Sequence, residues 1–374
     1  MNKHSHGSST EKEVRLGKIL GEDLRRGDFN RTMRRDYKEL KELFLDDRRK
    51  AKLKEMKHIK QWLYTAWWLL KALIRKLTPA RRLLLVVALI IMLMPHTIDY
   101  SGDRLRLSVE TSVLSIFILL FILMLELKDK LLARDELEAG RVVQRALMPQ
   151  QMPEVPGWSV WLFTRTANEV GGDLIDYQRT GEDRFRLSLA DVAGKGLKAA
   201  LLTAKLQATL RALTLDLANL TELGTKLNRI FYRDSLRSAF ASLVCVEVRS
   251  DSGHVAILNA GHLPPIVVRG TTIKETGKGN PALGILPEAT FTEQRLELST
   301  SDILLIFSDG LTEAKNEAGE FFGLQKLLVM LPLWKNLEPQ EIGKRIVDAV
   351  DRFIGEERPS DDLSLVLLKR EPTR

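Results

Sequence analysis

Cysteine is almost absent from this sequence, because the chain of 374 residues contains only Cys245. An internal disulfide framework and a cysteine-rich zinc site are therefore excluded, and a reducing compartment is expected. Cys245 lies in the apolar run AFASLVCVEV, which predicts a buried strand residue rather than a nucleophile. The patterns HExxH and GxSxG are also missing, which excludes the simplest zinc-protease and α/β-hydrolase sites.

The glycine-rich stretch LADVAGKGLKAA fails two tests for nucleotide binding. A Walker loop would need glycine at Leu189 and serine or threonine at Gly196. A dinucleotide fingerprint that starts at Gly194 would need a small third residue, and Ala199 is a marginal match without a βαβ context. The segment therefore needs another explanation.

Basic residues are concentrated at the start of the chain. Lysine and arginine number 57 against 49 aspartates and glutamates, for a net charge of +8, and they crowd into the first 82 positions. A basic segment ahead of apolar runs is typical of the cytoplasmic side of a membrane. We therefore predict a basic cytoplasmic segment at residues 1–60. A nucleic-acid-binding face is the lesser alternative and a solvated tail the simplest one; nucleic acid is not expected as a partner.

Two apolar runs without any charge follow, at 83–98 and 111–125. Each is slightly shorter than the roughly 20 residues that span a bilayer, so each alone could be a buried helix. Together they predict a membrane region at 61–127, with an interfacial helix at 61–76 and transmembrane helices at about 82–99 and 109–126. The flanking lysines and arginines place both termini in the cytoplasm.

The rest of the chain reads as a linker followed by a globular domain. Residues 128–149 predict a linker helix that Pro149 ends; whether it is a coiled coil or a plain connector stays open. Residues 150–374 hold groups of strands with pairs of helices between them, which predicts a mainly antiparallel α+β domain.

Several acids stand at the ends of predicted strands. Alternate apolar residues of RFRLSLAD lead to Asp191, and those of DILLIFSDG lead to Asp309. Asp361 and Asp362 precede a closing strand, and Asp173 ends VGGD. For each acid alone, a turn or helix cap is the simpler explanation. Together they predict an oxygen-liganded site that favours Mg²⁺ or Mn²⁺ over zinc, because unpaired buried carboxylates need a cation.

Five motifs occur in order: EVGGDLIDY, LADVAGKGLKAALLTAKL, LNAGHLPP, LIFSDGLTEAKNEAGEFFG and DDLSLVLL. From about residue 140 onward the chain resembles the bacterial metal-dependent serine/threonine phosphatases of the SpoIIE/RsbU type, within the PP2C-like superfamily. The resemblance implies an αββα sandwich with two Mn²⁺ or Mg²⁺ ions at one end. It also implies that a water activated by both metals attacks phosphoserine or phosphothreonine of a protein, without a phosphoenzyme.

The same resemblance assigns roles to individual residues. Asp191 matches the aspartate that bridges both metals, and Val192 matches the residue that supplies a backbone carbonyl. Asp309 and Asp361 match further metal-binding aspartates, and Asp173 matches the acid of the glycine-glycine-aspartate motif. These four aspartates are the predicted catalytic set. Supporting roles are expected for Asp176, through water, and for Gly194, Gly196 and Asp362.

The chain departs from the pattern at one position. Animal-type relatives carry histidine two residues after the bridging aspartate, where it can protonate the leaving oxygen, whereas this chain has Ala193. No general acid is identified, because a structural role is expected for His262. Arg165 is a candidate for binding the phosphate.

The sequence thus predicts a multi-pass phosphatase of the bacterial inner membrane, regulated through its linker helix. By resemblance, its substrate is a phosphorylated protein such as an anti-sigma-antagonist in a partner-switching pathway, and a homodimer through the linker helix is plausible. The alternative is a non-catalytic membrane scaffold that binds a signalling regulator, against which the retained acids argue.

Overall fold

A computed structural model describes Met33, Leu53, Met56 and residues 58–93, 97–102, 105–217, 219–235, 239–250 and 252–372. The chain divides into two compact units, Met1–Asp129 and Lys130–Arg374. Most of the basic segment predicted at 1–60 lies outside the described residues.

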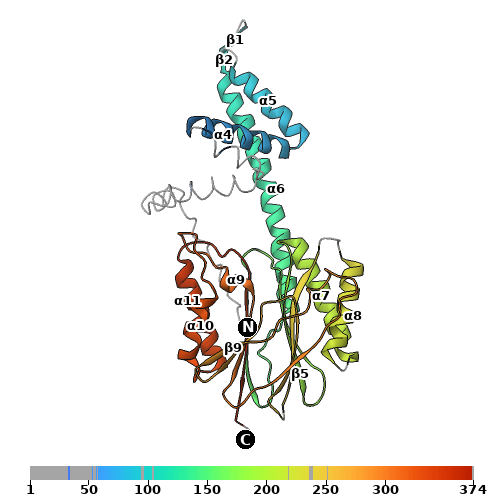
Figure 1. The fold of residues 1–374 in the computed structure, drawn as a ribbon. Coiled ribbons are helices and arrows are strands. Elements are labelled where there is room, and N and C mark those ends of the chain that lie inside the picture. The colour runs from blue at the N-terminus through green and yellow to red at the C-terminus, as the bar shows by residue number, and fades with distance from the viewer. Residues whose placement is uncertain are drawn as a thin grey trace, which may run out of the picture. The chain divides into compact units, whose positions relative to one another are not determined.

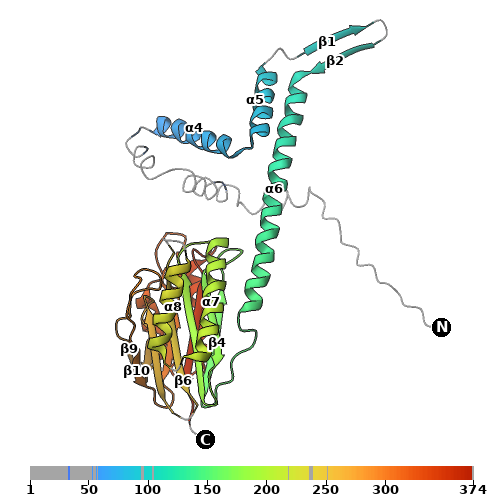
Figure 2. The same ribbon diagram turned by 90° about the vertical axis from the view of Figure 1, so that its right-hand side faces the viewer.

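The N-terminal unit is mainly helical. It contains α4 (His58–Lys76), α5 (Pro79–Leu93), the antiparallel strands β1 (Thr97–Gly102) and β2 (Leu105–Glu110), and the first part of α6 (Thr111–Leu147). α5 and the start of α6 lie side by side (Figure 2). Arg81 joins them through ion pairs of 2.6 Å with Glu126 and 2.6 Å with Asp129.

The helices of this unit have bounds that differ from the sequence prediction. The helix expected at about 82–99 is α5, which ends at Leu93, and Pro95 stands two residues further on, where proline opposes continuation of a helix. The strands β1 and β2 lie between this helix and α6. The helices expected at 109–126 and 128–149 are one continuous helix, because no glycine or proline interrupts the junction. No helix in the described ranges is both long and apolar enough to cross a membrane.

The C-terminal unit is a four-layer sandwich (Figures 1 and 2). Two five-stranded sheets have the orders β10-β7-β6-β5-β4 and β3-β12-β11-β8-β9, with antiparallel neighbours throughout. The αββα prediction is confirmed. The first sheet consists of β4 (Asp173–Arg179), β5 (Arg184–Val192), β6 (Ala241–Arg249), β7 (His254–Ala260) and β10 (Gln294–Glu297), and the second of β3 (Trp158–Arg165), β8 (Ile266–Arg269), β9 (Thr272–Glu275), β11 (Ile303–Phe307) and β12 (Leu363–Arg370).

Two pairs of helices cover the outer faces of the sheets. α7 (Leu197–Asp216) and α8 (Leu220–Asp234) pack on the first sheet, whereas α10 (Leu324–Met330) and α11 (Pro339–Ile354) pack on the second. α11 turns Ile342, Ile346 and Val350 to its sheet, at the four-residue spacing that places side chains on one helix face. The short α9 (Asp309–Thr312) and a 3-10 helix (Leu331–Trp334) complete the unit.

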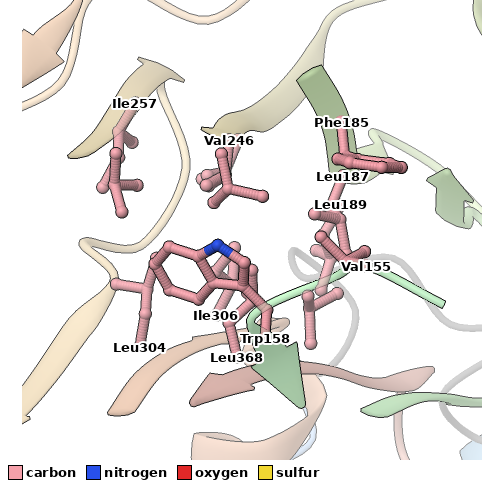
Figure 3. Close-up of a cluster of buried hydrophobic side chains, with 14 of the residues drawn as sticks. Val155, Trp158, Phe185, Leu187, Leu189, Val246, Ile257, Leu304, Ile306 and Leu368 are labelled. Carbon is pink, nitrogen blue, oxygen red and sulfur yellow. The ribbon is translucent and has the colours of Figure 1, made fainter. Parts of the chain in front are cut away.

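Three hydrophobic clusters fill the spaces between these layers. In the central cluster, Leu187 and Leu189 of the first sheet lie with Leu304 and Ile306 of the second, and the Trp158 ring lies among these side chains (Figure 3). Cys245 is fully buried in β6, and burial raises the pKa of its thiol to about 11. The prediction of a buried strand cysteine is therefore confirmed.

Candidate active site

Two of the predicted metal ligands face each other across neighbouring strands. Asp173, at the start of β4, pairs in register with Asp191, near the end of β5. Both continue the row of side chains that points between the sheets, because Ile175 and Leu189 belong to the central cluster. Asp173 is only 3% exposed, and its Oδ2 atom has no hydrogen-bond partner. A buried carboxylate oxygen without a partner is the position where a cation is expected.

The other two acids come from the second sheet. β11 ends at Phe307, and α9 begins at Asp309 after the Ser308 cap. β12 begins at Leu363, directly after Asp361 and Asp362, and it lies antiparallel beside β11. The end of one strand therefore adjoins the start of the next. The hydroxyl of Ser308 fixes this junction, since it donates to the Asp362 carbonyl at 3.0 Å and accepts from the Ser364 N–H at 2.9 Å.

The electrostatics show that these acids converge. The pKa of Asp191 is raised to about 7, first by burial and then by the negative charges of Asp309 and Asp361. Burial, followed by the charge of Asp191, holds the pKa of Asp173 well above its ordinary value. The pKa of Asp309 is raised by burial and by Asp361. The four predicted ligands thus form one cluster whose members repel one another, which we call the acid cluster.

Asp362 has a different role from its neighbour. Its carboxylate accepts hydrogen bonds from the N–H groups of Ala167 at 2.8 Å, Gly172 at 2.7 Å and Asp173 at 3.3 Å. Burial raises its pKa, and these three backbone donors oppose the rise. Asp362 therefore anchors the segment that carries Asp173, in agreement with the supporting role expected for it.

Asp176 is not brought into the acid cluster. It has the opposite strand parity to Asp173, so it points toward α7, where Arg211 binds both of its carboxylate oxygens at 2.7 and 2.9 Å. Arg211 also donates to the carbonyl of Leu147 at the end of α6. The odd spacing between the two aspartates was the sequence signal that could have separated their roles.

The end of α6 is bonded to the segment that carries Asp173. Gln144 donates to the carbonyl of Gly171 at 2.8 Å and accepts from the N–H of the same residue at 3.1 Å. Gln207 of α7 donates to the carbonyl of Leu147 at 2.7 Å. The sequence predicted a regulatory linker but pointed to no residue in it. Gln144, three residues before the end of α6 at Leu147, is the residue that was missed.

His262 and Arg165 are both occupied by other groups. The Nδ1 atom of His262 lies 2.6 Å from the Ser242 hydroxyl, and Nε2 lies 3.1 Å from the Phe307 carbonyl. Burial lowers the pKa of His262 to about 4, so a neutral ring ties the two sheets together, in agreement with the structural role expected for it. Arg165 makes a bidentate ion pair with Asp351, with distances of 2.6 and 2.9 Å, instead of reaching the acid cluster.

The turn after β5 lies beside the acid cluster. The Val192 N–H donates to the Gly172 carbonyl at 3.2 Å, which holds the turn against the segment before Asp173. Gly194 and Gly196 have φ angles of +119° and +71°, a region that residues with a β-carbon rarely adopt. The backbone turns tightly at these two glycines, for which a supporting role is expected from the sequence. The turn carries Lys195, whose ammonium lies 3.0 Å from the carboxylate of Asp361.

The comparisons with known proteins agree with this geometry. The family model described as stage II sporulation protein E (SpoIIE) matches residues 181–371, just over half of the chain. The chain belongs to the SpoIIE family. The resemblance found in the sequence is thereby confirmed for the C-terminal unit.

Individual relatives of this SpoIIE-family chain are distant. Protein IcfG of Synechocystis is 28% identical over 235 residues, which are 55% of this chain and 37% of IcfG. Phosphoserine phosphatase RsbU of Bacillus subtilis is 23% identical over 240 residues, 64% of this chain and 71% of RsbU. The SiaA-PP2C domain of Pseudomonas aeruginosa superimposes with a TM-score of 0.57 at 19% identity, covering 65% of this chain and 98% of that domain. The fold is therefore PP2C-like, as predicted.

Proposed function

We propose that this SpoIIE-family chain is a metal-dependent protein phosphatase that hydrolyses phosphoserine or phosphothreonine in bacterial signalling. The convergence of Asp173, Asp191, Asp309 and Asp361 at one end of the sandwich carries the proposal. The similarity to RsbU, which is named a phosphoserine phosphatase, supports it. A binding module has no need of four mutually repelling acids, so the similarity and the acid cluster favour an enzyme over a non-catalytic scaffold.

The acid cluster has the chemistry of a site for Mg²⁺ or Mn²⁺. All four side chains offer hard oxygen donors, and Asp173 Oδ2 is buried without a partner. Within the described part of the chain, no group of three or more acidic, histidine or cysteine side chains is already arranged to hold a metal ion. The four aspartates and the Val192 carbonyl are the proposed ligands of two ions.

The residues around the cluster position it for hydrolysis. Bound Mg²⁺ or Mn²⁺ would supply Lewis acidity toward a water and toward the phosphoryl group of the substrate. Asp362 holds the backbone before Asp173 in place, and Ser308 holds the backbone around Asp309 and Asp362. His262 fixes the spacing between the two sheets at this end, because it contacts Ser242 of one sheet and Phe307 of the other. Hydrogen bonds thus hold the backbone on both sides of the acid cluster.

Hydrolysis of a phosphoserine peptide by the full chain tests the proposal. We expect phosphate release with Mn²⁺ or Mg²⁺, loss of activity on chelation, and a decrease of at least ~10³-fold in Asp191→Asn, which removes a charge at the centre of the cluster. Asp348→Asn, an exposed aspartate of α11, is the matched control and should retain activity. Absence of metal-stimulated activity, or an unchanged rate in Asp191→Asn, would leave the scaffold hypothesis as the better one.

The physiological substrate is proposed to be a phosphorylated signalling protein of the anti-sigma-antagonist type. The similarity to RsbU supports a partner-switching pathway. The two-way hydrogen bonding between Gln144 and Gly171 supports control of the site through α6. Exposed apolar side chains on the second half of α6, for example Leu131, Val142 and Val143, support pairing of two copies through this helix.

We further propose that the N-terminal unit associates with the bacterial inner membrane, with both termini in the cytoplasm. Support comes from large apolar side chains that are exposed along α5 and the start of α6, for example Leu83 at 68%, Phe117 at 64% and Leu123 at 62%. After cell lysis, we expect the chain to sediment with membranes, to resist extraction by high salt and to dissolve in detergent. A C-terminal reporter that is active in the periplasm would contradict the proposed orientation.

A further inference from the structure

The backbone around Lys195 is shaped to present this side chain beside the acid cluster. Gly194 and Gly196 flank it with φ angles of +119° and +71°. A β-carbon at either glycine would have no neighbour within 4 Å, so the backbone conformation, rather than close packing, is what requires glycine there. A turn built in this way fixes the direction in which the intervening residue leaves the backbone.

The Lys195 side chain crosses from the first sheet to the second. Its ammonium donates to the carbonyl of Ser360 at 2.8 Å and lies 3.0 Å from Oδ2 of Asp361. Its positive charge opposes the rise in the pKa of both Asp191 and Asp309. Lys195 therefore interacts electrostatically with acids of both sheets. The ammonium therefore lies beside the acid cluster, close to the place where a phosphoryl group would meet the proposed metal ions.

Two other cations near this end are bound to acids of their own. Arg165 is paired with Asp351, and Arg211 is paired with Asp176. A phosphate monoester brings further negative charge to an acidic site, so a positive group besides the metal ions would favour its approach. Lys195 is in position to supply it.

The present partner of Lys195 is easily exchanged. The side chain of Lys195 is 61% exposed and that of Asp361 is 42% exposed, and solvent-exposed ion pairs contribute little to stability. Lysine carries a compact charge on a flexible stem, so its ammonium can move from one oxygen to another without a change in the backbone. Use of Asp361 as a metal ligand, as proposed above, would leave the ammonium free to take a phosphoryl oxygen.

We propose that Lys195 binds the phosphoryl group of the substrate. The sequence had suggested Arg165 for this role. The inference rests on the proposed phosphatase function. In this assignment Lys195 donates a hydrogen bond to a phosphoryl oxygen during binding and returns to Asp361 and Ser360 after phosphate leaves. It contributes to affinity for phosphate groups in general, including the inorganic phosphate that hydrolysis releases.

The test is calorimetric binding of inorganic phosphate to the full chain loaded with Mn²⁺, together with phosphopeptide hydrolysis. Loss of one charge-assisted hydrogen bond should weaken phosphate binding roughly tenfold to a hundredfold in Lys195→Met. KM for the phosphopeptide should rise more than kcat falls. Lys195→Arg should restore most of the affinity, and Lys198→Met, which removes an exposed lysine three residues away, should match the wild type.

Each outcome bears on one hypothesis. Equal phosphate affinity in the wild type and Lys195→Met overturns the inference, and so does an equal loss in Lys198→Met, which would indicate a general charge effect. A lower unfolding temperature with unchanged phosphate affinity also overturns it, because Lys195 would then only join two loops. Loss of phosphopeptide hydrolysis by the wild type itself contradicts the proposed function, whereas an active wild type with an unaltered Lys195→Met contradicts only the role of Lys195.

Discussion

Replacing Asp173 by asparagine is expected to abolish phosphatase activity and, at the same time, to stabilise the metal-free protein. Asp173 is 3% exposed, and burial and the neighbouring charge of Asp191 raise its pKa, a rise that hydrogen bonds from Ser364 and Ser308 offset only in part. The amide of asparagine removes this charge at nearly the same size. Relief of this buried charge should raise the free energy of unfolding by ~1–3 kcal/mol, while loss of a proposed metal ligand should lower kcat/KM by at least ~10²-fold.

The stability gained in Asp173→Asn should depend on pH. Because the pKa of Asp173 is higher in the folded state than in the unfolded state, ionised Asp173 destabilises the fold at high pH. The penalty fades as the pH falls through the folded-state pKa, since the carboxyl group then binds a proton. The stability gain of Asp173→Asn should therefore be largest in alkaline buffer and shrink in acid.

Urea unfolding in EDTA at several pH values measures this gain. Asp348→Asn, which removes an exposed charge on α11, is the control and should shift the free energy of unfolding by less than ~0.5 kcal/mol at every pH. A lower stability of the Asp173→Asn protein at alkaline pH would show that this carboxylate is satisfied without metal, contrary to the acid cluster described above.

Replacing Gly343 by alanine is expected to destabilise the C-terminal unit strongly, although a glycine-to-alanine change at an exposed position of a helix is usually stabilising. Gly343 lies in α11, and a β-carbon there would come within 1.9 Å of the Trp161 ring of β3. α11 would have to move away from the sheet or Trp161 would have to leave its rotamer. Overpacking costs ~1–3 kcal/mol and occasionally more, and an approach of 1.9 Å to a ring atom places this case at the upper end, above the ~1 kcal/mol that alanine gains over glycine in a helix.

A double-mutant cycle separates this steric effect from helix propensity. Trp161→Leu opens the space beside Gly343, so the double variant should be more stable than the sum of the two single changes predicts. Lys344→Ala, at the next and exposed position of α11, should change the unfolding temperature little. Additivity of the two changes, or a more stable Gly343→Ala protein, would refute the close approach of helix and sheet.

The layers of the fold were predictable because they depend on local pattern. Strand alternation and helical spacing decide which side chains can be buried together, and five motifs in order placed the chain in its family. The boundaries in the N-terminal unit were less predictable. Apolar content marks a helix there but does not fix its ends, so α5 ends at Leu93 and a single α6 replaces two expected helices.

The site shows where strand parity stops being informative. In β5, alternation places Asp191 on the face between the sheets, as Leu187 and Leu189 show. In β11, the same argument followed the row of Leu305 and Phe307, but these side chains pack under α10 and α11, on the outer face of the sheet. Asp309 reaches the acid cluster because the strand ends and α9 begins, not because of its parity.

The sequence by itself determined the fold class, the family and the identity of the four aspartates, since strand alternation and motif order are properties of short stretches. Only the tertiary structure decided how these acids are used. In the tertiary structure, Asp173 lies opposite Asp191 and Asp176 forms an ion pair with Arg211. Asp362 accepts hydrogen bonds from backbone N–H groups, and Lys195 forms an ion pair with Asp361. Charge, burial and hydrogen bonding between residues far apart in the chain depend on distances that no local pattern contains.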